Sequence, residues 1–78
     1  MKDLSEIISE NIKLALAKRG ESQHSLALAV GISKSKMSTV LRGESTLDSL
    51  EIYSIATHFQ ISISWFYEEH LGEIAQAA

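Results

Sequence analysis

The sequence has 78 residues, 45% of them hydrophobic, and a formal net charge of −3 at pH 7. This length allows one small domain with a modest core, and the absence of cysteine excludes a disulfide framework and a thiolate metal site. Apolar runs are only a few residues long and the start MKDLSEI lacks the apolar stretch of a secretion signal, so we expect a soluble, cytoplasmic protein without a membrane segment.

Apolar residues recur at helical spacing in five segments, and no alternating strand pattern competes with them. The predicted helices cover residues 4–19, 23–30, 34–41 or 34–42, 47–59 and 63–71. The fourth is expected to bury a broad apolar face made of Leu47, Leu50, Ile52, Ile55, Ala56 and Phe59. The pattern therefore predicts an all-α fold.

Glycines and small polar residues mark the expected helix ends. The predicted N-caps are Ser22, Ser33, Thr46 and Ser62, and the glycines expected to end helices are Gly20, Gly31, Gly43 and Gly72. With no proline, repeat or linker, this punctuation predicts a compact bundle with short connections. We expect a single domain over residues 1–78, with its core in residues 4–72 and a C-terminal tail at 73–78.

Charge is unevenly distributed along the chain. Residues 11–43 contain six basic residues and one acid, Glu21, and so carry a charge of +5 (6 − 1). From residue 44 onward there are six acids and no lysine or arginine. This separation indicates one basic face suited to a polyanion and another that is acidic and solvated.

Residues 23–42, QHSLALAVGISKSKMSTVLR, form the most informative stretch. Counted from Gln23, the fifth residue is Ala27 and the ninth is Gly31. The apolar positions of the stretch include Leu26, Val30, Ile32, Met37 and Val40. A small residue at Ala27 allows close helix approach, and glycine suits a tight turn at position 31. With its flanks, the stretch resembles the helix-turn-helix of lambda-repressor-like, Xre-type DNA-binding domains over roughly residues 8–72.

The resemblance implies a compact five-helix DNA-binding domain whose helix-turn-helix lies at the second and third helices. The second motif helix is expected to enter the DNA major groove and to contact base edges. The base-contact candidates are Lys34, Ser35, Ser38 and Thr39. The phosphate-contact candidates, which set register rather than sequence, are Gln23, Ser33, Lys36, Arg42 and Ser45.

The sequence departs from the family pattern at one buried pair. Many relatives carry an arginine four residues before the glycine that ends the first helix, paired with a glutamate two residues before the glycine that ends the recognition helix. Here those positions are Leu16 and Leu41. Since an apolar pair can match a buried ion pair in stability, we expect Leu16 and Leu41 to touch.

The sparse positive charge predicts that one copy binds DNA weakly. With Lys34, Lys36 and Arg42 as the main cations, one copy neutralises ~3–4 phosphates, for a salt slope of about −3. Two copies on a palindromic site one helical turn apart, ~34 Å, would double the contacts. The candidate dimer interface is the consecutive aromatic run Trp65, Phe66 and Tyr67. Tyr67 is the favoured interface residue, whereas for Trp65 and Phe66 a place in the core is favoured over one at the interface.

Two functions remain open on these grounds. The first is a sequence-specific transcriptional regulator, a bacterial or phage repressor that acts as a homodimer on double-stranded DNA. The alternative is a protein-interaction module of the same fold, such as an antitoxin or anti-regulator with a protein partner, which the acidic ends favour. An enzyme is not expected, because no nucleophile with a base and no glycine-rich phosphate loop is present. We also expect no cofactor and no metal site, since His24, His58 and His70 are scattered.

Overall fold

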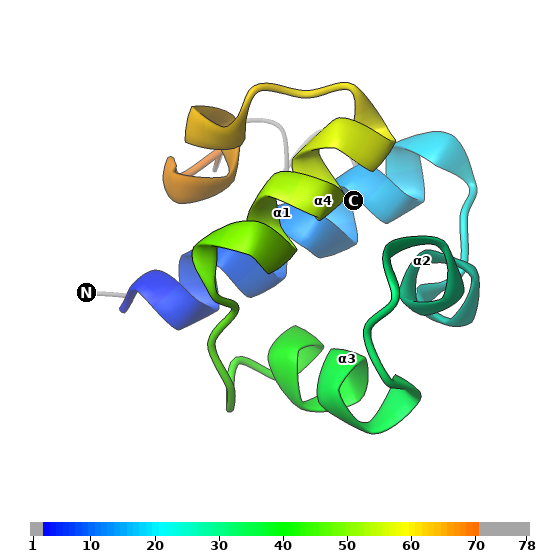
Figure 1. Cartoon of the computed structure of the whole chain (residues 1–78). Helices are drawn as coiled ribbons and strands as arrows, with labels where there is room; N and C mark the ends of the chain where they lie inside the picture. The colour runs from blue at the N-terminus through cyan, green and yellow to red at the C-terminus, as the bar shows by residue number, and fades with distance from the viewer. Residues whose placement is uncertain (1–2, 71–78) are drawn as a thin grey trace.

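The computed structural model describes residues 3–70. Its elements are α1 (Leu4–Arg19), α2 (Gln23–Val30), α3 (Lys34–Leu41), α4 (Ser49–Phe59) and a 3₁₀ helix, η1 (Ile63–Tyr67). No strand occurs within residues 3–70. The helix α1 packs against α3 and η1, while α2 packs against both α3 and α4. Figure 1 shows α3 at the lower edge of the molecule and η1 at its upper left, with α1 and α4 between them.

Side-chain caps set the start of the first three helices. Asp3, Ser22 and Ser33 are the N-caps, and the oxygen of each side chain accepts a hydrogen bond from the backbone N–H three residues later. These bonds satisfy N–H groups that have no partner within the helix. The predictions of Ser22 and Ser33 as caps, and of the bounds of these helices, are confirmed.

The start of α4 corrects the prediction of a cap at Thr46. The N-cap is Asp48, whose Oδ1 accepts from the N–H of Glu51 at 2.8 Å, while Glu51 Oε1 accepts from the N–H of Asp48 at 3.0 Å. This reciprocal capping box satisfies two donors where Thr46 could satisfy one. The prediction that Leu50 is buried is also wrong: it is 77% exposed, whereas Leu47 packs partly buried against the core.

The segment after α4 forms a 3₁₀ helix and not the predicted α-helix. Its N-cap, Ser62, makes no side-chain capping bond. Asn11 of α1, which is 1% exposed, donates through Nδ2 to the carbonyl oxygens of Trp65, Phe66 and Glu68 at 3.3, 2.8 and 2.7 Å. Because a side chain from α1 satisfies these carbonyls, the turn is stable without continuing as an α-helix. The predicted continuation to Leu71, its end at Gly72 and the tail at 73–78 lie outside the described residues.

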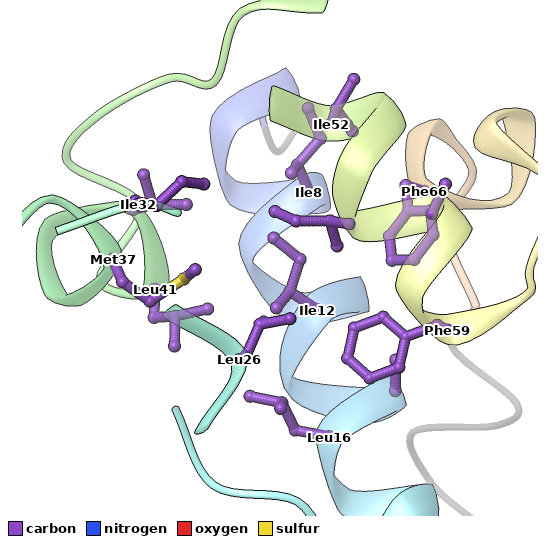
Figure 2. Close-up of a cluster of buried hydrophobic side chains, with 14 of the residues drawn as sticks. Ile8, Ile12, Leu16, Leu26, Ile32, Met37, Leu41, Ile52, Phe59 and Phe66 are labelled. Carbon is purple, nitrogen blue, oxygen red and sulfur yellow. The ribbon is translucent and has the colours of Figure 1, made fainter. Parts of the chain in front are cut away.

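One cluster of buried apolar side chains joins all five elements (Figure 2). Phe66, Ile12 and Leu26 are 0% exposed and contribute from η1, α1 and α2. Leu16 and Leu41 belong to the same cluster, at 7% and 6% exposed, and their direct contact stays a prediction. This core fixes the orientation of α2 and α3, and therefore decides which face of α3 points outward.

Candidate nucleic-acid interface

The α2–α3 unit is anchored to the core through one face of each helix. Leu26 and Ala27 of α2 are buried, as are Met37 and Val40 of α3. Between them Gly31 adopts a left-handed conformation with φ 72°, which an L-residue other than glycine adopts with strain. The unit therefore presents the opposite face of α3 to solvent.

The four base-contact candidates differ in how free their side chains are. Lys34 and Ser35 are exposed and make no hydrogen bond or ion pair with any residue in the part of the chain that the structure describes. Thr39 is half-buried, and its Oγ1 donates to the carbonyl oxygen of Lys36 at 2.9 Å. Ser38 Oγ accepts from Nη1 of Arg42 at 2.8 Å. The first turn of α3 is thus the part whose side chains are most available for an external partner.

The phosphate-contact candidates lie around two surface depressions. Gln23 and Lys34 line one of them together with His24, between the N-terminus of α2 and that of α3. The other depression lies between α3 and the segment that leads to α4, and it is rich in hydroxyl groups. It is lined by Ser33, Ser35, Lys36, Thr39, Glu44, Ser45 and Thr46. The fold therefore brings these candidates onto one continuous side of α3, except Arg42, which lies at its C-terminal end.

Two of the predicted DNA-contacting cations are held by carboxylates. Lys36 Nζ donates to both carboxylate oxygens of Glu51 at 2.8 Å. Arg42 Nε lies 3.2 Å from Oε1 of Glu44. The sequence reasoning did not identify either acid as part of the site. Glu44 could have been found because it follows Arg42 by two residues, whereas Glu51 is fifteen residues from Lys36 and no local spacing links them.

The three aromatic residues of the candidate dimer interface have different environments. Phe66 is 0% exposed and packs in the core, so it is removed from the candidate interface. Trp65 is half-buried, with the ring of His70 stacked at 4.2 Å and Lys18 Nζ 5.8 Å from its centroid. Tyr67 is 41% exposed and is the aromatic residue of this run most available to a second copy.

No group of three or more histidine, aspartate or glutamate side chains within residues 3–70 could hold a metal ion. His58 Nε2 instead lies 2.7 Å from Oε2 of Glu21, joining the end of α4 to the loop between α1 and α2. Over the same residues, no helix is long and apolar enough to cross a membrane.

Comparison with solved structures identifies a protein of similar fold. The chain resembles the crystal structure of a hypothetical transcription factor, NHTF, from Neisseria, with a TM-score of 0.83 and 20% sequence identity. The likeness covers 95% of this chain and 85% of the other. No protein-family model and no curated protein matches the chain. At this identity the likeness establishes the fold, a small all-helical domain in which α2 and α3 fit a helix-turn-helix.

Proposed function

We propose that this protein is a transcriptional regulator that binds double-stranded DNA in a sequence-specific way. The observation that carries the proposal is the outward face of α3: the side chains of Lys34 and Ser35 stand in its first turn, directly after the capped N-terminus, and have no partner within residues 3–70. A helix N-terminus with a free lysine and hydroxyl is suited to phosphate and base edges. The fold shared with a protein described as a hypothetical transcription factor supports the same function.

The proposed roles follow the position of each side chain. Lys34 is suited to the O6 and N7 acceptors of guanine, and Ser35 to a hydrogen bond with a neighbouring base. Ser38 and Thr39 complete the base-contacting set. Gln23, Ser33 and Ser45 are proposed to contact phosphates, as are Lys36 and Arg42 when their ion pairs with glutamate open.

We further propose that the regulator is a lambda-repressor-like, Xre-type protein of bacterial or phage origin. It would act in the cytoplasm as a repressor, bound as a homodimer to a palindromic operator. Only a few basic side chains lie on α3 and its C-cap, namely Lys34, Lys36 and Arg42. This supports a dimer, because a second copy doubles the phosphate contacts. The exposed Tyr67 is our candidate for the self-contact.

The proposal is tested by selecting bound duplexes from random DNA and measuring affinity for the selected site. The double variant K34A/S35A removes both free side chains of α3, and we expect an affinity loss of about 10-fold or more, since one good base contact contributes about 1–3 kcal/mol. The control is K18A, which makes the same change in charge in the last turn of α1, where Lys18 Nζ lies 5.8 Å from the centroid of the Trp65 ring. Equal affinities for K34A/S35A and K18A would contradict the assigned site.

A second function is supported by a separate surface. Leu50 and Tyr53 are 77% and 62% exposed, three residues apart on α4, and so lie on one face of that helix. Exposed apolar pairs of this kind suit a protein partner. If the protein is an antitoxin or anti-regulator, the triple variant K34A/S35A/K36A will retain partner binding. If it is a DNA-binding regulator, the same variant will lose its operator.

A further inference from the structure

The ion pair between Lys36 and Glu51 is the most constrained charge pair near α3. Both carboxylate oxygens of Glu51 accept from Lys36 Nζ at 2.8 Å, and Oε1 also accepts from the N–H of Asp48. The Glu51 side chain is only 22% exposed and that of Lys36 is 40% exposed. Because the capping box already fixes the carboxylate, pairing with Lys36 requires little further ordering of Glu51.

The second pair, Arg42 with Glu44, is looser. The Nε–Oε1 distance is 3.2 Å, and both side chains are more than half exposed, at 54% and 61%. Ser38 adds a hydrogen bond from Arg42 Nη1, which keeps the guanidinium along the end of α3. Solvent and salt weaken such an exposed pair, so it restrains Arg42 less than Glu51 restrains Lys36.

These pairs change the number of cations available to DNA. Among the described residues of α3 and its C-cap there are three basic side chains, and two of them, Lys36 and Arg42, are neutralised within the protein. Binding to non-cognate DNA depends on the number of phosphates that a protein neutralises, whereas cognate binding also gains from base contacts. An internal carboxylate that competes with phosphate therefore removes a larger share of the free energy of non-cognate binding than of cognate binding.

We propose that Glu51, and to a smaller extent Glu44, hold Lys36 and Arg42 away from phosphates and so suppress binding to non-cognate DNA. This inference rests on the proposed DNA-binding function. Lys36 stays paired with Glu51 when the protein meets random DNA, and Lys34 then supplies the free charge of α3. The base-reading side chains Lys34 and Ser35 are not engaged by either acid, so cognate recognition keeps its base contacts.

The test measures binding of a mixed-sequence 24-base-pair duplex, and of the selected site, by fluorescence anisotropy over a range of salt. E51Q removes the charge of Glu51 but keeps a side-chain oxygen for the capping box, where glutamine is as suitable as glutamate. Freeing one cation makes the salt slope steeper by about 0.9 and raises affinity for the mixed duplex by up to about 8-fold at 0.1 M salt. E44Q is expected to give a smaller gain with the mixed duplex. At the selected site, where Lys36 and Arg42 are proposed to reach phosphates, either variant should change the salt slope less than it does with the mixed duplex.

Two further variants separate pairing from net charge. E69Q makes the same change in charge two residues after the end of η1, which lies on the opposite side of the molecule from α3 (Figure 1), and is expected to leave the slope unchanged. K36M removes the lysine and should leave binding of the mixed duplex unchanged in the wild-type background, while in the E51Q background it should abolish the gain. Thermal unfolding checks that each variant folds. If E51Q does not fold, the salt slope of K36M with the mixed duplex tests the inference by itself.

The possible results distinguish a failure of this inference from a failure of the proposed function. If the wild type binds DNA but E51Q and E69Q have equal slopes, the inference is overturned while the proposed function stands. If K36M by itself flattens the slope for the mixed duplex by about 0.9, Lys36 already contacts phosphate on non-cognate DNA and the inference is again overturned. If neither the wild type nor any variant binds any duplex, both the inference and the proposed function are wrong.

Discussion

Residues 22–43 and residues 44–70 are held in place in different ways. In the first region, the caps at Ser22 and Ser33 and the turn at Gly31 all act within a few residues of the helices they bound. In the second, the shape of η1 depends on Asn11 of α1, more than fifty residues away in sequence. The ends of α2 and α3 are therefore set by residues close to them in sequence, while η1 depends on a residue of α1 that is distant in sequence.

The largest expected loss of stability comes from a substitution that acts on the second region, residues 44–70. In N11A the carbonyl oxygens of Phe66 and Glu68 lose the Asn11 donor, while that of Trp65 still accepts from the N–H of Glu68 and lies 2.8 Å from His70 Nε2. We expect the free energy of unfolding to fall by about 2–3 kcal/mol, chiefly because the buried carbonyl of Phe66 is left without this donor. Denaturant unfolding measures the loss. Hydrogen exchange should accelerate at residues 63–68 and change little in α2 and α3.

A matched control for this variant is S9A on the same helix. Ser9 is also buried, but its Oγ donates a single hydrogen bond, to the carbonyl oxygen of Leu41 at 2.7 Å. We expect a loss of about 1 kcal/mol. If N11A is no more destabilised than S9A, Asn11 does not hold η1 in the way inferred, and the two regions do not differ in their dependence on α1.

The next effect falls on the first region, at the turn of the helix-turn-helix. An alanine at Gly31 meets no atom within 4 Å, so any destabilisation comes from the backbone conformation at φ 72° alone. We expect G31A to lower the free energy of unfolding by about 1–2 kcal/mol, and G31N to lower it less, since asparagine tolerates this conformation better. Equal stability of G31A and the wild type in thermal unfolding would show that the turn can rearrange.

The features that could be predicted from the sequence are mostly those set by neighbouring residues, as in residues 22–43. Ser22, Ser33 and Gly31 could be identified because their signals are local, and so could the outward position of Lys34. The Asp48–Glu51 capping box was also readable, as an acid followed three residues later by glutamate, but Thr46 was preferred. Neighbouring threonine, aspartate and serine residues all offer caps, and only the reciprocal bonds of the folded helix distinguish them.

Contacts between distant residues account for what the sequence could not supply. The periodicity of residues 63–71 is helical, and nothing local indicates that Asn11 will take up the carbonyls of this segment and stabilise a 3₁₀ turn. In the candidate site, the types and exposure of the side chains followed from helical spacing. The pairing of Lys36 with Glu51 did not, because it requires the N-terminus of α4 to pack beside α3.

A smaller loss of stability tests where α4 begins within the second region. In D48A the N–H of Glu51 loses its acceptor, and we expect a loss of about 1 kcal/mol, within the usual range for an N-cap. T46A, two residues earlier, should change stability by less than about 0.5 kcal/mol. Thermal unfolding of the two variants side by side compares the caps, and a larger loss in T46A would restore the start of α4 predicted from the sequence.

The smallest expected loss of stability concerns Leu50, an apolar residue of α4 that the fold leaves exposed to solvent. Since it is 77% exposed, L50Q should change the free energy of unfolding by less than about 0.5 kcal/mol, whereas I52V, at a position 1% exposed on the same helix, should lose about 0.5–1.5 kcal/mol. This difference makes L50Q a clean probe of the second candidate function. A loss of partner binding with unchanged stability would assign Leu50 to a protein interface. A clear loss of stability in L50Q would instead mean that Leu50 is buried within the folded chain, contrary to the structure.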